Sequence, residues 1–132
     1  MDQFEKWALE MAGKETNEGH KMRNFDTGAT RDSDDGKLHY KGFLSTIALK
    51  QFAEYMESHR IQADGSLRDP DNWKKGIPLD AYEDSFSRHF FEWLGELESG
   101  NRRKAYEIAP ALFFNLQGWM HEMGKANVHN PQ

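Results

Sequence analysis

The sequence contains no cysteine, only four prolines and no long apolar run. The missing cysteines exclude a disulfide framework, a thiolate zinc site and a cysteine nucleophile, and they are typical of a reducing compartment. A membrane helix needs about 20 consecutive apolar residues, and a secretion signal needs a basic start followed by an apolar segment. Neither pattern is present, so we expect a cytoplasmic protein without a membrane partner.

An excess of basic residues is also missing. The chain has 22 acidic and 17 basic side chains, which gives a net charge of −5 at pH 7. A protein that binds the nucleic-acid backbone needs a basic surface that displaces counterions, so nucleic acid is not an expected partner. Binding of a small phosphorylated ligand is still compatible with this charge, because a local cluster such as Arg102, Arg103 and Lys104 can pair with phosphate within an acidic chain.

The chain is instead rich in large rings placed at helical spacing. Its 132 residues suffice for one domain, and its 9 Phe, 4 Trp and 4 Tyr can build a compact core. Apolar residues recur with the helical period over residues 2–14, 43–59, 79–98 and 101–124. The pattern predicts an all-α fold, a small helical bundle with long N-terminal and inter-helix loops. Because short helices with broad aromatic faces bury more surface when paired between chains, we expect a homo-oligomer.

Local signals predict where the helices begin and end. Ser45 and Thr46 lie near the start of the second helix, and Asp80 is a candidate N-cap or first-turn acid of the third. Ser99 and Gly100 should end that helix. Pro110 should kink or split the fourth, because proline lacks the backbone donor and clashes with the preceding turn.

The predicted helices divide the chain into three parts. We expect an N-terminal helix and linker over residues 1–24, a helical nucleotide-binding domain over 25–125 and a disordered tail over 126–132. The polar stretch 14–41 is predicted to be a long loop, with a short hairpin around residues 37–40 as an option.

Charged side chains are repeated along one face of the predicted helix 79–98. Asp84, Arg88 and Glu92 lie four residues apart and therefore stack on successive turns. They form either a solvated stripe or the wall of a groove, where carboxylates joined by others from a facing helix would suit Mg²⁺. His89 is either a core histidine or a polar group at a phosphate site.

Asn115 interrupts the apolar run of the last helix. A buried amide there must find a hydrogen-bond partner, so it either ties two helices together or contacts a ligand. Glu107, two turns earlier on a nearby face, could share the same groove.

The segment Asn72-Trp73-Lys74-Lys75 combines an indole with two cations. An indole can stack on a nucleobase, and lysine can pair with phosphate. The alternative is that Trp73 only fills the edge of the core. We expect a ligand groove between the helices 79–98 and 101–124, closed by this segment.

Several short blocks, taken in order, resemble a phage family described as the dATP/dGTP diphosphohydrolase N-terminal domain. The resemblance spans about residues 25–124. The blocks that carry it are Phe25-Asp26-Thr27-Gly28-Ala29-Thr30-Arg31-Asp32, Gly36-Lys37 with Tyr40, Gly42-Phe43-Leu44, Asn72-Trp73-Lys74-Lys75-Gly76-Ile77-Pro78, Tyr82, Arg88-His89-Phe90 and Trp93.

That family is similar to the all-α nucleotide pyrophosphohydrolases, which hold Mg²⁺ with clustered Glu and Asp and release pyrophosphate from a nucleoside triphosphate. The resemblance implies Asp84, Glu96 and Glu107 as catalytic and metal-binding acids. It also implies Arg88, His89 and Asn115 as nucleotide-binding residues, beside the segment 72–75. A phage origin would place the protein in the host cytoplasm.

The sequence also departs from the family pattern. The expected Glu-x-x-Asp pair reads Glu96 to Ser99. The His-rich stretch expected on the last helix is replaced by Tyr106-Glu107-Ile108-Ala109-Pro110. Two functions are therefore weighed: a pyrophosphohydrolase that uses Mg²⁺, and a nucleotide-binding sponge that needs no cofactor and sequesters a bacterial immune nucleotide signal. A purely structural helical module is the third alternative.

Overall fold

The computed structural model describes residues 2–7 and 21–129, with side chains described as far as residue 126. These residues fall into two compact units. The helical unit covers residues 45–126, and the other unit holds the residues before 45 and after 126. Residues 25–44, which we expected within the helical domain, therefore lie outside the helical unit.

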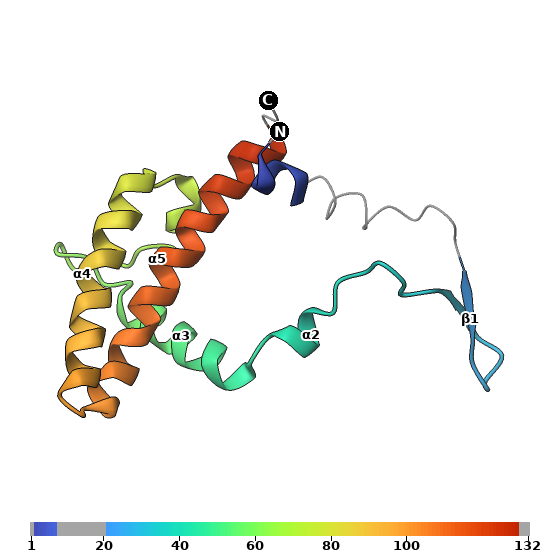
Figure 1. The fold of residues 1–132 in the computed structure, drawn as a ribbon, viewed down its shortest axis with the longest axis horizontal. Coiled ribbons are helices and arrows are strands. Elements are labelled where there is room, and N and C mark those ends of the chain that lie inside the picture. Colours follow the sequence, from blue (N-terminus) through green and yellow to red (C-terminus); the bar gives the residue numbers. More distant parts are fainter. Residues whose placement is uncertain (1, 8–20, 130–132) are drawn as a thin grey trace. The chain divides into compact units, whose positions relative to one another are not determined.

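The described part of the chain is mostly helical, which confirms the all-α prediction (Figure 1). Residues 3–7 are helical, and the rest of the predicted helix 2–14 lies outside the described residues. The other elements, in chain order, are β1 (Met22–Asn24), β2 (Thr30–Asp32), α2 (Tyr40–Phe43), α3 (Thr46–Ser58), the 3-10 helix η1 (Asn72–Lys75), α4 (Leu79–Glu98) and α5 (Arg102–His129).

The only sheet among the described residues is a hairpin of two short antiparallel strands. Arg23 of β1 pairs with Arg31 of β2, and Gly28 in the connecting turn has a φ of 88°, which favours glycine. This hairpin lies earlier in the chain than the optional one at 37–40, where the structure has no strand and α2 begins at Tyr40.

Helix α3 begins at Thr46, three residues later than predicted. The hydroxyl of Ser45 accepts a hydrogen bond of 3.1 Å from the backbone N–H of Ala48, which caps the helix at this point. Phe43 and Leu44 therefore lie outside α3, and both are largely exposed.

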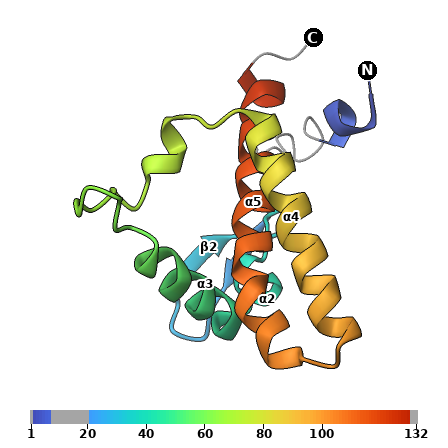
Figure 2. The same cartoon turned by 90° about the vertical axis from the view of Figure 1, so that its left-hand side faces the viewer.

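Helices α4 and α5 form an antiparallel helical hairpin (Figure 2). Helix α4 matches the predicted range 79–98, with Asp80 as its first-turn acid. It ends at Ser99, and Gly100 follows with a φ of 77°. The side chain of Asn101 then accepts a hydrogen bond of 3.1 Å from the N–H of Lys104 and starts α5.

Helix α5 bears on two expectations. Pro110 lies inside one continuous helix, so of the two predicted outcomes, a kink or a split, the split is excluded. The carbonyl of Tyr106, which loses its helical donor to the proline, is bonded by a side chain from α3 instead. The helix also continues through Gly124 to His129, so residues 126–129 are helical rather than a disordered tail.

The buried apolar core of the described residues consists of Tyr82, Ala105 and Ala111, and Tyr82 lies where α4 meets α5. A Cβ added at Gly118 would lie 2.2 Å from Cζ of Tyr82, so only glycine lets the two helices approach this closely. No helix in the described ranges is both long and apolar enough to cross a membrane.

Candidate functional site

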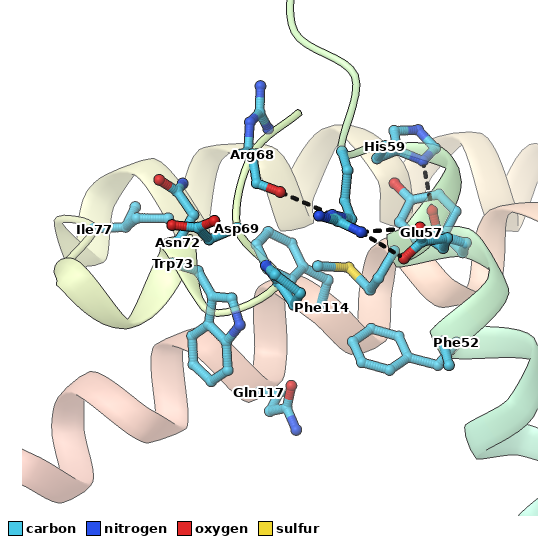
Figure 3. Close-up of a pocket in the computed structure, with 15 residues that line it drawn as sticks. Phe52, Glu57, His59, Arg68, Asp69, Asn72, Trp73, Ile77, Phe114 and Gln117 are labelled. Carbon is cyan, nitrogen blue, oxygen red and sulfur yellow. Dashed lines mark hydrogen bonds and ion pairs between the residues drawn. The ribbon is translucent and has the colours of Figure 1, made fainter. Parts of the chain in front are cut away.

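The main cavity of the helical unit has a volume of about 590 Å³ and lies between α3, the loop 59–78 and α5 (Figure 3). This volume is in the range of small-molecule sites. The lining residues are Phe52, Ala53, Tyr55, Met56, Glu57, His59, Arg60, Arg68, Asp69, Pro70, Asn72, Trp73, Ile77, Phe114 and Gln117.

Aromatic rings from three separate elements make up much of the cavity wall. Trp73 extends from η1 toward α5, where Phe114 and Gln117 lie (Figure 3). The indole meets the ring of His121 edge-on, with 4.9 Å between their centroids. On the α3 side, Phe52 packs edge-on against Phe113 at 4.5 Å. The cavity therefore offers ring surfaces to a flat apolar ligand.

Arg60 holds the loop against the end of α3. Its guanidinium donates a hydrogen bond of 3.0 Å to the carboxylate of Glu57 and another of 2.8 Å to the backbone carbonyl of Arg68. The same loop is closed by an isolated bridge between Ile61 and Leu67. Arg60 is thus engaged within the protein, whereas the guanidinium of Arg68 points away from the ring cluster (Figure 3).

Two side-chain amides add hydrogen-bonding capacity to this apolar wall. Asn72 and Gln117 both line the cavity, and neither side chain has a hydrogen-bond partner within the described part of the chain. Each amide offers two N–H donors and an acceptor oxygen, which can form hydrogen bonds with the edge of a nucleobase.

His59 and Tyr55 form the end of the cavity at the C-terminus of α3. Nδ1 of His59 lies 2.8 Å from the carbonyl oxygen of Tyr55 and 3.0 Å from the hydroxyl of Ser58. If the ring hydrogen is on Nδ1, the Tyr55 carbonyl accepts it. The other nitrogen, Nε2, is then an acceptor in the neutral ring. Burial raises the pKa of the Tyr55 hydroxyl above its ordinary value.

The structure brings only two of the predicted nucleotide-binding residues into this cavity, Asn72 and Trp73. Lys74 and Lys75 are exposed, and the ammonium of Lys74 lies 5.6 Å from the centroid of the Trp73 ring. Lys74 is therefore close to the cavity without lining it, and Lys75 is not part of the lining.

The remaining predicted ligand contacts lie elsewhere. Arg88 is exposed on α4, and Nδ1 of His89 faces the carboxylate of Glu92 at 3.6 Å. Asn115 is buried, but its amide donates a hydrogen bond of 2.8 Å to the carbonyl of Ala111 in its own helix. This bond stays within α5 and uses one of the N–H donors of the amide.

The predicted groove between α4 and α5 holds a smaller hollow of about 340 Å³. No cation lines it, and Nε1 of Trp119 donates a hydrogen bond of 2.8 Å to Glu83 there. The hollow is lined by Tyr82, Glu83, Phe86, Leu116 and Trp119. The larger cavity lies instead beside α3, because the loop 59–78 folds across that side of α5.

The carboxylates expected to bind Mg²⁺ are not gathered into one site. Asp84 lies near the start of α4, Glu96 near its end, and Glu107 pairs with Arg103 at 3.3 Å on α5. Within residues 2–7 and 21–129 no three His, Asp or Glu side chains are grouped so that they could hold a metal ion.

Sequence reasoning placed the segment 72–75 at the site but missed the earlier part of the loop 59–78 as a cavity wall. Arg60 and Arg68 flank the turn at Asp64-Gly65-Ser66, and Glu57 lies three residues before Arg60. This charge spacing is a local signal that the loop folds back on α3. No local signal marked Gln117, because its position depends on how α5 meets the loop.

The described chain is mostly helical and contains a cavity with aromatic lining residues. Comparisons with protein families, curated proteins and solved structures found no match to this chain. The resemblance to the phage diphosphohydrolase family stays a prediction that rests on the residue blocks alone.

Proposed function

We propose that this protein binds a nucleotide or a nucleotide-derived small molecule in the cavity between α3, the loop 59–78 and α5. The observation that carries the proposal is the combination of ring surfaces with unpaired amides. Trp73 and Phe114 offer flat apolar contact, while Asn72 and Gln117 supply donors and acceptors beside them. A nucleobase needs both kinds of contact.

The charged part of such a ligand belongs at the mouth of the cavity. Arg60 is paired with the exposed carboxylate of Glu57, so its charge is already engaged. Lys74, next to the Trp73 ring, and Arg68, whose guanidinium points outward, are the nearby cations (Figure 3). Lysine and arginine at the rim would pair with phosphate while the base occupies the aromatic interior.

Binding without turnover is the activity that we propose. Release of pyrophosphate would require several carboxylates to converge on the phosphates, and Asp84, Glu96 and Glu107 do not converge in the described chain. A protein that captures a nucleotide signal and does not destroy it would act as a sponge, the role weighed for a phage protein in a host cell.

Incubation of the pure protein with a panel of linear and cyclic nucleotides tests the proposal. Free ligand and any product are read by chromatography after equilibrium dialysis, with Mg²⁺ in one arm and a chelator in the other. We expect one class of nucleotide to be depleted in both arms and recovered intact after denaturation. Depletion of no nucleotide would overturn binding, and Mg²⁺-dependent product would overturn the sponge in favour of hydrolysis.

The proposal includes self-association of the chain. Three fully buried apolar side chains are a small core for a unit that spans residues 45–126, since a domain of this size normally buries most of its apolar surface. Large apolar side chains are exposed in the same unit, and a partner chain would cover them.

A further inference from the structure

Asp69 lines the cavity with a carboxylate that the local fold does not use. It precedes Pro70 in the loop 59–78, and an aspartate at such a turn commonly bonds the next N–H groups with its side chain. Here the backbone carbonyl of Asp69 accepts the hydrogen bond of 3.0 Å from the N–H of Asn72 instead. The Asp69 side chain is exposed and has no partner within the described part of the chain, so a ligand can reach it.

The other carboxylate of the cavity lining is already engaged. Both oxygens of Glu57 accept hydrogen bonds from Nη1 of Arg60, at 3.0 and 3.3 Å. A carboxylate is an acceptor without donors, and its charge repels phosphate. The part of a ligand that meets Asp69 is therefore a group with N–H donors and not a phosphate.

Asp69 lies beside an aromatic ring and an amide. Asn72 and Trp73 follow it closely in the chain, and the three residues lie together on the cavity wall (Figure 3). The indole offers a stacking surface for a base. Asp69 adds two acceptor oxygens, and the amide of Asn72 adds N–H donors. This part of the wall thus presents a pair of acceptors next to a donor.

Among the common bases, guanine carries the complementary set of groups. Its Watson–Crick edge has two neighbouring donors, N1–H and the N2 amino group, beside the acceptor O6. Two adjacent N–H groups can bond both oxygens of one carboxylate, as the fork of a guanidinium does. Adenine, cytosine and uracil each present a ring nitrogen or carbonyl lone pair in place of one of these donors, and a lone pair is repelled by a carboxylate.

We propose that Asp69 makes the cavity selective for guanine nucleotides. The base stacks on Trp73, its N1–H and N2 amino group bond to Asp69, and O6 accepts from the amide of Asn72. Lys74, whose ammonium lies 5.6 Å from the centroid of the Trp73 ring, stays available for the phosphate. This inference rests on the proposed function, because a cavity that binds no nucleotide has no base to select.

Calorimetric titration of the purified chain with the 5′-monophosphates of guanosine, inosine and adenosine tests the choice of base. Inosine lacks the N2 amino group and keeps the rest of the guanine edge. We expect the inosine nucleotide to bind about tenfold less tightly than the guanosine nucleotide, through the loss of one charge-assisted hydrogen bond, and the adenosine nucleotide to bind more weakly still.

Two outcomes of this titration overturn the selectivity for guanine. If the adenosine nucleotide binds as tightly as the guanosine nucleotide, the selectivity falls and the proposed function stands. If none of the three binds, the selectivity also falls, and the wider panel of linear and cyclic nucleotides decides whether the proposed function falls with it.

Asp69→Asn tests the residue itself, since asparagine keeps the size of the side chain but replaces one acceptor oxygen with an N–H donor. The variant should bind the guanosine nucleotide about tenfold less tightly. It should bind xanthosine 5′-monophosphate better than the wild type does, because xanthine has a carbonyl oxygen where guanine has the N2 amino group.

Asp71→Asn is the matched control. It removes the same charge from the same loop, two residues further on, at a position that is not part of the cavity lining. It should keep the wild-type preference for guanosine over xanthosine monophosphate. An unchanged preference in Asp69→Asn, or an equal change in Asp71→Asn, overturns the assignment of base selection to Asp69.

Discussion

The side-chain amide of Gln51 in α3 donates a hydrogen bond of 2.6 Å to the backbone carbonyl of Tyr106 in α5. In a regular helix that carbonyl would accept from the N–H of residue 110, which is a proline here. The contact therefore replaces the bond that Pro110 removes. It also ties α3 to α5 beside the ligand cavity.

Replacing Gln51 with alanine should lower the free energy of unfolding by about 1 kcal/mol, because the Tyr106 carbonyl loses its donor. The same replacement should cost less in a Pro110→Ala background, where the restored N–H can bond that carbonyl. Urea unfolding of the four chains of this double-mutant cycle measures the difference. Equal costs in both backgrounds would show that the two residues do not serve the same carbonyl.

Gly118→Ala should destabilise the helical unit by about 3 kcal/mol, since the new Cβ would overlap the ring of Tyr82. Gly95→Ala is the matched control in α4, because nothing lies within 4 Å of its Cβ position. That control should be stabilising by up to about 1 kcal/mol through helix propensity. Thermal and urea unfolding measure both stability changes. Equal changes in Gly118→Ala and Gly95→Ala would contradict the close contact between Gly118 and Tyr82.

Stability should fall at alkaline pH, and part of the fall should come from Tyr82. Burial, and then the negative charge of Glu122, raise the pKa of the Tyr82 hydroxyl above its ordinary value of about 10. The folded state therefore keeps this proton where the unfolded state loses it. The contribution is complete below about pH 10 and is lost as the pH rises toward the folded pKa.

Tyr82→Phe should accordingly flatten the decline of unfolding free energy above about pH 10. It should cost little at neutral pH, because the buried hydroxyl has no hydrogen-bond partner among the described residues. Tyr40→Phe, at an exposed ring, serves as the control for the loss of a hydroxyl. If the unfolding free energy of Tyr82→Phe falls with pH as steeply as that of the wild type, Tyr82 does not contribute to the alkaline loss of stability.

Much of the fold was predictable because its signals are local. The range of α4 and the stop at Ser99 and Gly100 each depend on residues within one or two turns. The outcome at Pro110 was not predictable in the same way, because it depends on Gln51, which lies far away in the sequence.

The candidate site was only partly predictable for the same reason. Asn72 and Trp73 stood out by residue type and do line the cavity, but Arg88 and His89 stood out equally and do not. The distinction is made by the loop 59–78, which brings Trp73 against His121 of α5 rather than into the groove with α4. Such a long-range contact leaves no spacing that a sequence pattern can reveal.

The most direct test of the cavity compares the affinity of wild type, Trp73→Ala and Arg88→Ala for the nucleotide that the panel selects, measured by calorimetric titration. Trp73→Ala should weaken binding by about 1–3 kcal/mol, the scale of one stacked base. Arg88→Ala should bind like the wild type, because Arg88 lies on α4 away from the cavity. Loss of affinity in Arg88→Ala with full affinity in Trp73→Ala would contradict the account and place the ligand on α4.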